Sequence, residues 1–149
     1  MDLMGDLGRG SMGLDSSLFI YYIEEHPEYL PLVEPVFAAI DRRQRRAVTS
    51  GVTLLEVLVV PYRAGNLQLA ERYETLLTRS RGLTMIDLSR PLLRSAAQLR
   101  ARFHLRTPDA LQLAAAIAEG CTAFLTNDRD LPTIPGIRIL QLKDYLSPQ

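Results

Sequence analysis

The sequence predicts an α/β fold in which a short central parallel sheet is flanked by helices on both faces. The main observation is that short apolar segments of strand character alternate with longer segments of helical periodicity. The second is size: 149 residues, of which 47% are apolar and 23% charged, suffice for one domain with a buried core. No internal repeat, low-complexity tract or interdomain linker is present, so we expect one domain over residues 14–146.

The first 13 residues are expected to lie outside this domain, as a flexible leader or a remnant of cloning. They contain four Gly and three Met and show no periodicity. This leaves only residues 12–14 for a strand before Asp15.

The individual elements follow from apolar spacing and from residues that begin and end helices. After a first strand that ends at Asp15, a helix capped by Ser16 or Ser17 is expected to run to residue 25. Pro61 is expected to end or kink the helix before it, and Thr107 is expected to cap the last helix. The other strands are expected at 47–50, 83–88, 122–126 and 137–140, and the other helices at 29–44, 52–60, 66–79, 89–103 and 107–119.

The composition argues against several classes of protein. A formal net charge of zero disfavours strong non-specific attraction to nucleic acid, although it leaves room for a local basic groove. Cys121 is the one cysteine, so no internal disulfide can form. The sequence has no apolar run of 18 residues and no signal-peptide pattern, so we expect a soluble cytoplasmic protein with no membrane span.

Four acidic residues stand in unusually apolar surroundings. Asp15 and Asp128 each follow a predicted strand, and ligands of open α/β sheets bind beyond the carboxyl ends of the strands. Glu56 interrupts the run VTLLEVLVV, where an unpaired carboxylate is costly or takes up a proton. Asp109 opens an Ala/Leu-rich helix, whose dipole favours the ionised form. The simpler alternatives are an ordinary first-turn acid for Asp109 and a narrow solvent-exposed helix edge for Glu56.

A pocket that contains these acids requires a neutralising cation. No basic residue adjoins Asp15, Glu56 or Asp109, so the positive charge is expected to come from elsewhere. An all-oxygen ligand set suits Mg²⁺, with Mn²⁺ as a second possibility. His26 in a polar turn and His104 at a helix end do not form a zinc site.

Four stretches together resemble a known family: LDSSLFIYYIE, TLLEVLVVPYR, TPDALQLAAA and FLTNDRDL. In this order and spacing they are similar to the PIN domain, and particularly to the VapC-type toxins of bacterial toxin–antitoxin pairs. The resemblance covers residues 14–146. It implies a PIN-like fold and a Mg²⁺-dependent endoribonuclease that forms a homodimer and binds a cognate antitoxin, which inserts a segment near the pocket. The family normally has a longer apolar strand before its first Asp, so this sequence departs from it at the start, where a short or frayed strand is expected.

The resemblance also implies that Asp15, Glu56, Asp109 and Asp128 form the acidic catalytic pocket. Our hypothesis is that Asp15 and Asp109 bind the principal metal directly, while Glu56 and Asp128 act through water or hold a second ion. One-metal and two-metal chemistry both remain open. Asp130 is a possible extra acid, for which solvation in a loop is the simpler role.

Arginines are the candidates for holding RNA. Arg100, Arg102 and Arg106 precede the Asp109 helix and would contact phosphates, which gives affinity and salt dependence rather than sequence choice. A second cluster at residues 42–46 is explained more simply as a solvated helix end. The apolar faces of helices 52–60 and 66–79 indicate either a partner surface or ordinary core packing.

Other functions were weighed against the same acids. A receiver-type switch or an Asp-x-Asp phosphatase needs a second acid near Asp15, where Ser16 and Ser17 stand instead. A catalytically idle PIN-like module that binds RNA or a partner remains the alternative to the nuclease.

Overall fold

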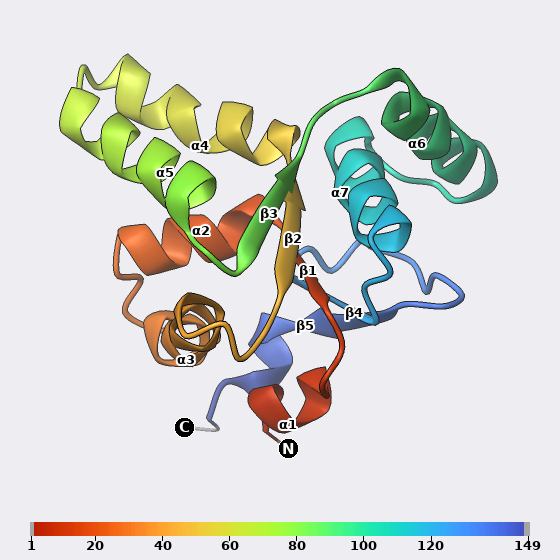
Figure 1. Cartoon of the computed structure of the whole chain (residues 1–149), viewed down its shortest axis with the longest axis horizontal. Helices are drawn as coiled ribbons and strands as arrows, with labels where there is room; N and C mark the ends of the chain where they lie inside the picture. The colour runs from red at the N-terminus through yellow and green to blue at the C-terminus, as the bar shows by residue number, and fades with distance from the viewer. Residues whose placement is uncertain (1, 148–149) are drawn as a thin grey trace.

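The computed structural model describes residues 2–147. A parallel sheet of five strands lies at the centre of this part of the chain (Figure 1). The strands are β1 (Met12–Leu14), β2 (Ala47–Ser50), β3 (Leu83–Ile86), β4 (Ala123–Thr126) and β5 (Arg138–Gln141). The helices are α1 (Leu3–Leu7), α2 (Ser16–Ile23), α3 (Leu30–Asp41), α4 (Gly51–Arg63), α5 (Leu67–Arg79), α6 (Arg90–Arg102) and α7 (Thr107–Ala118), followed by the 3₁₀ turn η1 (Leu142–Tyr145). The predicted α/β class and parallel sheet are therefore confirmed.

The strand order β3-β2-β1-β4-β5 places the first strand at the centre. From β1 the chain builds outward through β2 to β3, then crosses back to add β4 and β5 on the other side. The order therefore reverses between β1 and β4, and such a point opens a crevice at the carboxyl ends of the strands. Leu14 pairs with Leu125 at the end of these two strands, so the residues that follow each strand become neighbours.

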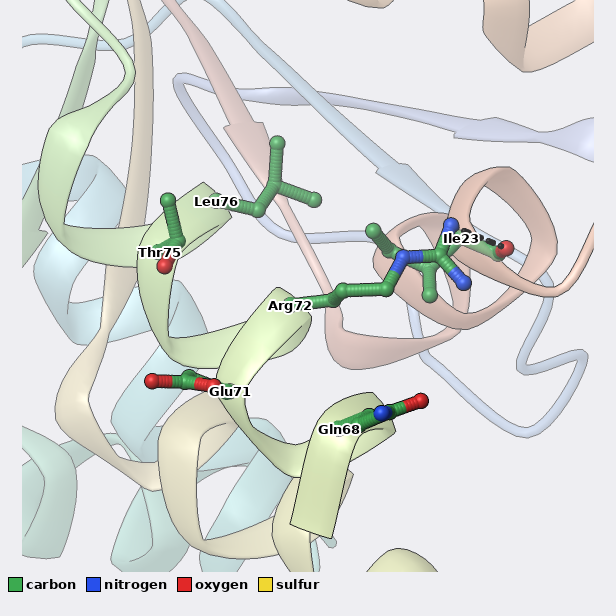
Figure 2. A pocket seen from close by; sticks show the side chains of 6 residues that line it. All are labelled: Ile23, Gln68, Glu71, Arg72, Thr75 and Leu76. Atoms are coloured by element: carbon green, nitrogen blue, oxygen red, sulfur yellow. Dashed lines mark hydrogen bonds between the residues drawn. The ribbon is translucent and has the colours of Figure 1, made fainter. Parts of the chain in front are cut away.

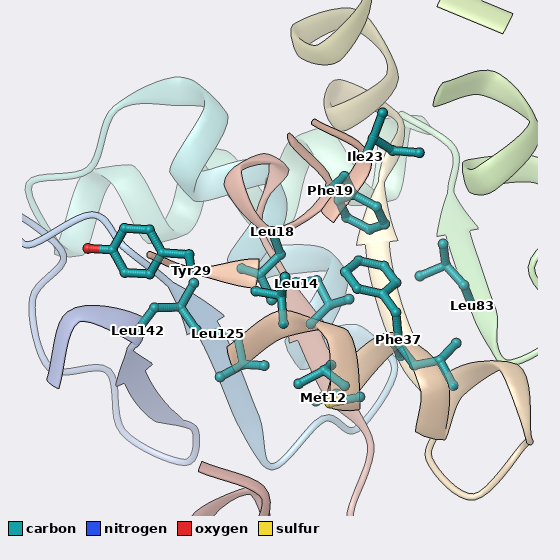
Figure 3. Close-up of a cluster of buried hydrophobic side chains, with 14 of the residues drawn as sticks. Met12, Leu14, Leu18, Phe19, Ile23, Tyr29, Phe37, Leu83, Leu125 and Leu142 are labelled. Atoms are coloured by element: carbon teal, nitrogen blue, oxygen red, sulfur yellow. The ribbon is translucent and has the colours of Figure 1, made fainter. Parts of the chain in front are cut away.

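Alternation along the strands divides the core into two layers. Met12, Leu14 and Leu125 face one layer, which they share with aromatic and aliphatic side chains from α2 and α3 (Figure 3). Val48 and Phe124 face the other layer, which is covered by α6 and the Ala-rich α7. Figure 1 shows α2 to α5 on one side of the sheet and α6 with α7 on the other. Helices thus cover both faces, as predicted.

The prediction that residues 1–13 lie outside the core is wrong for the part that the structure describes. Leu3 and Leu7 of α1 are 3% and 1% exposed and belong to the first core layer. Arg138 of β5 donates from Nη2 to the carbonyl of Leu7 over 3.1 Å, and Tyr145 donates to Asp6 Oδ2 over 2.6 Å. The lack of periodicity misled because a five-residue helix is too short to show one.

Gly13 allows the closest contact between the sheet and α7. A Cβ atom at this position would lie 2.7 Å from Ala116 Cβ and 2.7 Å from Phe124 Cδ1, closer than side chains tolerate. The absence of a side chain on the central strand therefore lets α7 pack directly against it. This contact lies on the same helix that carries Asp109.

The prediction that Pro61 ends or kinks its helix is wrong in its first form, because α4 continues to Arg63. A proline removes a single backbone donor, and Pro61 is itself buried. Within residues 2–147, no helix combines the length and the apolar character that crossing a membrane requires.

Candidate active site

Asp15 sits directly after the central strand, where it begins α2. Its Oδ1 accepts a hydrogen bond of 2.8 Å from the backbone N–H of Ser17, so Asp15 itself is the N-cap, and not Ser16 or Ser17 as predicted. The Ser17 hydroxyl donates to the same oxygen, and the Thr126 hydroxyl donates to Oδ2. Burial raises the pKa of Asp15, and these hydrogen bonds partly offset that rise. Both carboxylate oxygens thus accept hydrogen bonds from uncharged donors.

Thr126 connects the two sides of the crevice. It ends β4, is fully buried, and donates its hydroxyl to Asp15. The same oxygen accepts a 3.0 Å hydrogen bond from the backbone N–H of Asp128. A single side chain therefore sets the position of one acid and the backbone of another. The sequence analysis missed this residue, because a threonine in a β-strand is ordinary and carries no signal of its own.

Asp109 and Asp128 form a close pair that is bridged by Arg106. Nη2 of Arg106 lies 2.9 Å from Asp128 Oδ2, and its Nε lies 3.4 Å from Asp109 Oδ2. The premise that no basic residue flanks Asp109 is therefore wrong, because Arg106 lies three residues before it and pairs with it. At that spacing the first turn of a helix brings the two side chains together.

The pair divides its protons unequally. Burial, followed by the neighbouring Asp128 carboxyl, raises the pKa of Asp109 to about 6. Burial acts in the same direction on Asp128, but the Asp130 backbone N–H, the Asp109 carboxyl and Arg106 together hold the pKa of Asp128 below its usual value. Two carboxyl groups at this separation resist simultaneous ionisation. When both Asp109 and Asp128 are ionised, their two negative charges face the single positive charge of Arg106.

Glu56 reaches the same region from α4. Burial raises the pKa of this half-buried group, and the hydroxyl of Ser16 opposes the rise. The nearby Asp15 carboxylate raises the pKa of Glu56 further, while Arg106 lowers it. Glu56 is therefore within electrostatic range of Asp15 and of Arg106. The exposed Asp130 contributes its backbone N–H to Asp128 Oδ1 over 3.0 Å and otherwise faces solvent.

Thr107 does not cap the last helix as predicted. Arg106 occupies the N-cap position, and Thr107, Pro108 and Asp109 fill the first turn. Proline at the start of this helix is as expected.

A buried polar chain beneath the acids was also missed. Gln112 of α7, 3% exposed, donates from Nε2 to Thr53, and Thr49 donates to the carbonyl of Leu14 over 2.9 Å. The hydroxyls of Thr49 and Thr53 lie 2.7 Å apart and complete the chain. Oε1 of Gln112 accepts from the N–H and the hydroxyl of Ser50 over 3.0 and 2.9 Å. The network ties α7 to the ends of β1 and β2, which is where the first acid emerges.

The other candidate arginines have different roles in this structure. Arg100 holds the loop between α6 and α7 by donating to the carbonyl of Leu105 and the hydroxyl of Thr107, each over 2.9 Å. Cζ of Arg102 lies over the ring of Phe103, 5.2 Å from the ring centroid. The cluster at residues 42–46 precedes β2 and so lies at the amino ends of the strands, away from the acids.

The donor set consists of carboxylate oxygens, which are the ligands that a hard divalent cation prefers. Carboxylates from separate segments meet at this crevice: Asp15 and Asp128 are joined through Thr126, and Asp128 and Asp109 through Arg106. Burial raises the pKa values of Asp15, Glu56 and Asp109, so a nearby cation would stabilise the ionised form of each. Among residues 2–147, however, no three His, Cys, Asp or Glu side chains are arranged as a ready metal cluster. Arg106 instead occupies oxygens of Asp109 and Asp128 that a cation would use.

A separate hollow of about 510 Å³ lies between α2 and α5, away from the acids. Figure 2 shows its lining residues Ile23, Gln68, Glu71, Arg72, Thr75 and Leu76. Arg72 crosses it to donate to the carbonyl of Ile23 over 3.3 Å. We do not assign catalysis to this hollow, since its one carboxyl group has no acidic neighbour in the lining.

The fold and the acidic crevice define a class of protein. The family model of the PIN domain matches residues 12–137, and the chain belongs to this family. No curated protein sequence matches the chain.

Solved structures similar to this chain come from toxin–antitoxin systems. One is VapBC2 of Rickettsia felis bound to promoter DNA, with 20% identity and a TM-score of 0.64, covering 88% of this chain and 97% of the other. Another is DNA-bound VapBC of Salmonella typhimurium, with 24% identity and a TM-score of 0.62, covering 89% of this chain and 98% of the other. A third is VapC20 of Mycobacterium tuberculosis, a Sarcin-Ricin loop cleaving toxin. It has 15% identity and a TM-score of 0.65, covering 80% of this chain and 92% of the other. The chain therefore has the fold of VapC toxins.

Proposed function

We propose that this protein is a Mg²⁺-dependent endoribonuclease that hydrolyses RNA phosphodiester bonds and serves as the toxin of a type II toxin–antitoxin system. The observation that carries the proposal is that Thr126 joins Asp15 to Asp128, and Arg106 joins Asp128 to Asp109, beyond the carboxyl ends of β1 and β4. Glu56 of α4 lies within electrostatic range of Asp15 and Arg106. Membership of the PIN family and the likeness to VapC structures, one of them an RNA-cleaving toxin, support it.

In this proposal Asp15 and Asp109 hold the principal Mg²⁺ or Mn²⁺, and Glu56 and Asp128 complete the pocket through water or a second ion. When bound, the cation would relieve charge at phosphorus and make water a better nucleophile near neutral pH. The protein contributes a rigid Asp15, whose two oxygens are oriented by Ser17 and Thr126. Glu56 would accept the proton of the attacking water, since burial raises its pKa and the metal is assigned to Asp15 and Asp109.

RNA would approach across the exposed arginines next to the crevice. Arg100 and Arg102 lie at the end of α6, one loop before the Asp109 helix. Phosphate contacts from such side chains give salt-dependent affinity and no sequence choice.

The partners are also proposals. The similar structures from Rickettsia and Salmonella are VapBC assemblies of toxin and antitoxin, which supports a cognate antitoxin for this chain. The exposed apolar side chains of α4 and the start of α5 support a protein partner or a homodimer. Leu55, Val60 and Leu67 are 64%, 63% and 69% exposed, well above the exposure of a core residue.

The decisive experiment combines metal titration with RNA cleavage. Calorimetry with Mn²⁺ and Mg²⁺ should show binding, and RNA cleavage should require the metal and stop with EDTA. Asp15→Asn is expected to reduce cleavage by at least about a hundredfold while the fold persists, because a charged oxygen ligand is lost. Asp41→Asn, an exposed acid at the end of α3, is the matched control. Undiminished cleavage by Asp15→Asn would contradict the assignment.

One observation favours the idle binding module as a second candidate. Arg106 lies across Asp109 and Asp128, as a structural ion pair would. If calorimetry detects no metal binding while RNA or a partner still binds, the idle module is the correct interpretation.

A further inference from the structure

Arg106 is held on the acids by contacts that can be exchanged. Its side chain is 75% exposed, and its guanidinium reaches Asp109 Oδ2 at 3.4 Å and Asp128 Oδ2 at 2.9 Å. Exposed ion pairs of this kind contribute little to stability. The two carboxylates, in contrast, are 17% and 16% exposed. The arginine is therefore the mobile member of the group and the acids are the fixed members.

The surrounding backbone does not depend on these contacts. Arg100 holds the loop before α7 through the carbonyl of Leu105 and the hydroxyl of Thr107, both at 2.9 Å. The backbone carbonyl of Arg106 accepts from Ala110 over 3.0 Å and begins the helix. The guanidinium of Arg106 can leave the acids while loop and helix keep their positions.

A divalent cation and Arg106 compete for the same atoms. The Oδ2 atoms of Asp109 and Asp128 are those that the guanidinium contacts. A cation bound to these oxygens would repel the adjacent guanidinium, and its double charge balances the crowded carboxylates better than one arginine does.

We propose that Arg106 is a built-in counter-cation of the metal site: it occupies the Asp109 and Asp128 oxygens until a divalent cation displaces it. Once displaced, the guanidinium lies free at the rim of the crevice and binds an RNA phosphate. The inference rests on the proposed function for the existence of the metal site. It adds that metal binding and RNA contact are coupled through one side chain.

The first test measures Mn²⁺ affinity without RNA, by electron paramagnetic resonance and calorimetry. Arg106→Gln is expected to bind Mn²⁺ about threefold to tenfold more tightly than the wild type, because two ion pairs no longer compete. Arg129→Gln is the matched control: Arg129 is adjacent to Asp128 in sequence and pairs with Asp144 at 3.0 Å, and its loss changes the net charge equally. Arg106→Lys keeps the charge without the fork and is expected to fall between wild type and Arg106→Gln.

The outcomes separate the exchange from the metal site itself. If the wild type binds Mn²⁺ but Arg106→Gln binds it no more tightly than Arg129→Gln does, the exchange is overturned and the nuclease proposal stands. No Mn²⁺ binding by the wild type, Arg106→Gln or Arg106→Lys overturns both. Should Arg106→Gln fail to give a cooperative melting transition, Arg106→Lys provides the comparison, and an affinity equal to that of the wild type overturns the exchange.

The second test measures RNA binding with Ca²⁺ in place of Mg²⁺, with the RNA checked by gel to be intact. In Ca²⁺, the wild type is expected to show a salt slope steeper than that of Arg106→Gln by about 0.7, the value for one phosphate contact on a single strand. In EDTA the two slopes should coincide, because Arg106 remains on the acids. Equal slope differences in both conditions, or none in either, overturn the coupling.

Discussion

The two sides of the acidic crevice are built in opposite ways. On the β1 side, Asp15 is held by two hydroxyl groups and a backbone N–H, all neutral donors within the packed interior. On the α7 side, Asp109 and Asp128 face each other and share an exposed arginine. One carboxylate is fixed by its surroundings, and the other two remain under electrostatic strain. The difference is therefore between a carboxylate held by neutral donors on one side and two carboxylates balanced by a solvent-exposed cation on the other.

This contrast has a physical basis in where each group sits. The end of a central parallel strand is buried on both faces, so its polar groups must be satisfied locally. The first turn of α7 and the loop after β4 lie at the rim, where a long arginine can reach in from solvent. Three substitutions test the contrast, from the largest expected effect to the smallest.

Removing the Thr126 hydroxyl should break the rigid side. Thr126→Val keeps the shape but leaves Asp15 without one donor and the Asp128 N–H without its acceptor. We expect Mn²⁺ affinity to fall about tenfold to a hundredfold, as for other groups that orient metal ligands. Calorimetry measures this effect. Thr126→Ser retains the hydroxyl and is expected to stay near wild type; a comparable loss in both variants would show that packing, not the hydrogen bonds, matters.

Removing the polar chain beneath the acids should affect stability more than chemistry. Gln112→Met keeps the volume but leaves the N–H and the hydroxyl of Ser50 without their buried acceptor. The free energy of unfolding should fall by about 1–3 kcal/mol, as measured by urea denaturation. Gln98→Met on the exposed face of α6 is the control, expected near zero. A neutral result for Gln112→Met would mean that water or a neighbour replaces these contacts.

Neutralising the strained side should raise stability while it removes function. The folded-state pKa of Asp109 is about 6 against an ordinary 3.8, so ionisation of this group opposes folding. The penalty is absent below about pH 3.8, grows as pH rises, and is complete above about pH 6. Asp109→Asn removes it and should gain about 1 kcal/mol at pH 7.5, a value discounted for the partial compensation by Arg106.

Urea denaturation at pH 7.5 and pH 4 measures this gain. The stabilisation should largely disappear at pH 4, where wild-type Asp109 is protonated. A gain that is equal at both pH values would assign it to a cause other than ionisation.

The sequence analysis located the acids because an acid in an apolar run is conspicuous. Asp15 and Asp128 follow strands, and the parallel arrangement brings the ends of neighbouring strands together whatever the details of packing. Glu56 and Asp109 were predicted to join them, and Asp109 shares Arg106 with Asp128. Their catalytic role remains a prediction.

Other features could not be anticipated because they depend on short-range geometry. Thr126 and Gln112 are unremarkable as residue types, and only their buried partners make them important. Arg106 was taken as an RNA contact, whereas in the folded chain its guanidinium rests on two carboxylates. The helix at Leu3–Leu7 escaped notice because its stability comes from packing against the core.

Local residue chemistry was therefore sufficient to determine the α/β class, the alternation of strands and helices and the four candidate acids, because these depend on periodicity and on the cost of burying charge. The tertiary structure alone decided which donor satisfies each carboxylate and which cation balances it. At the crevice, the hydrogen bond between Asp15 and Thr126 spans 111 residues of sequence and forms only when the strand ends are brought side by side.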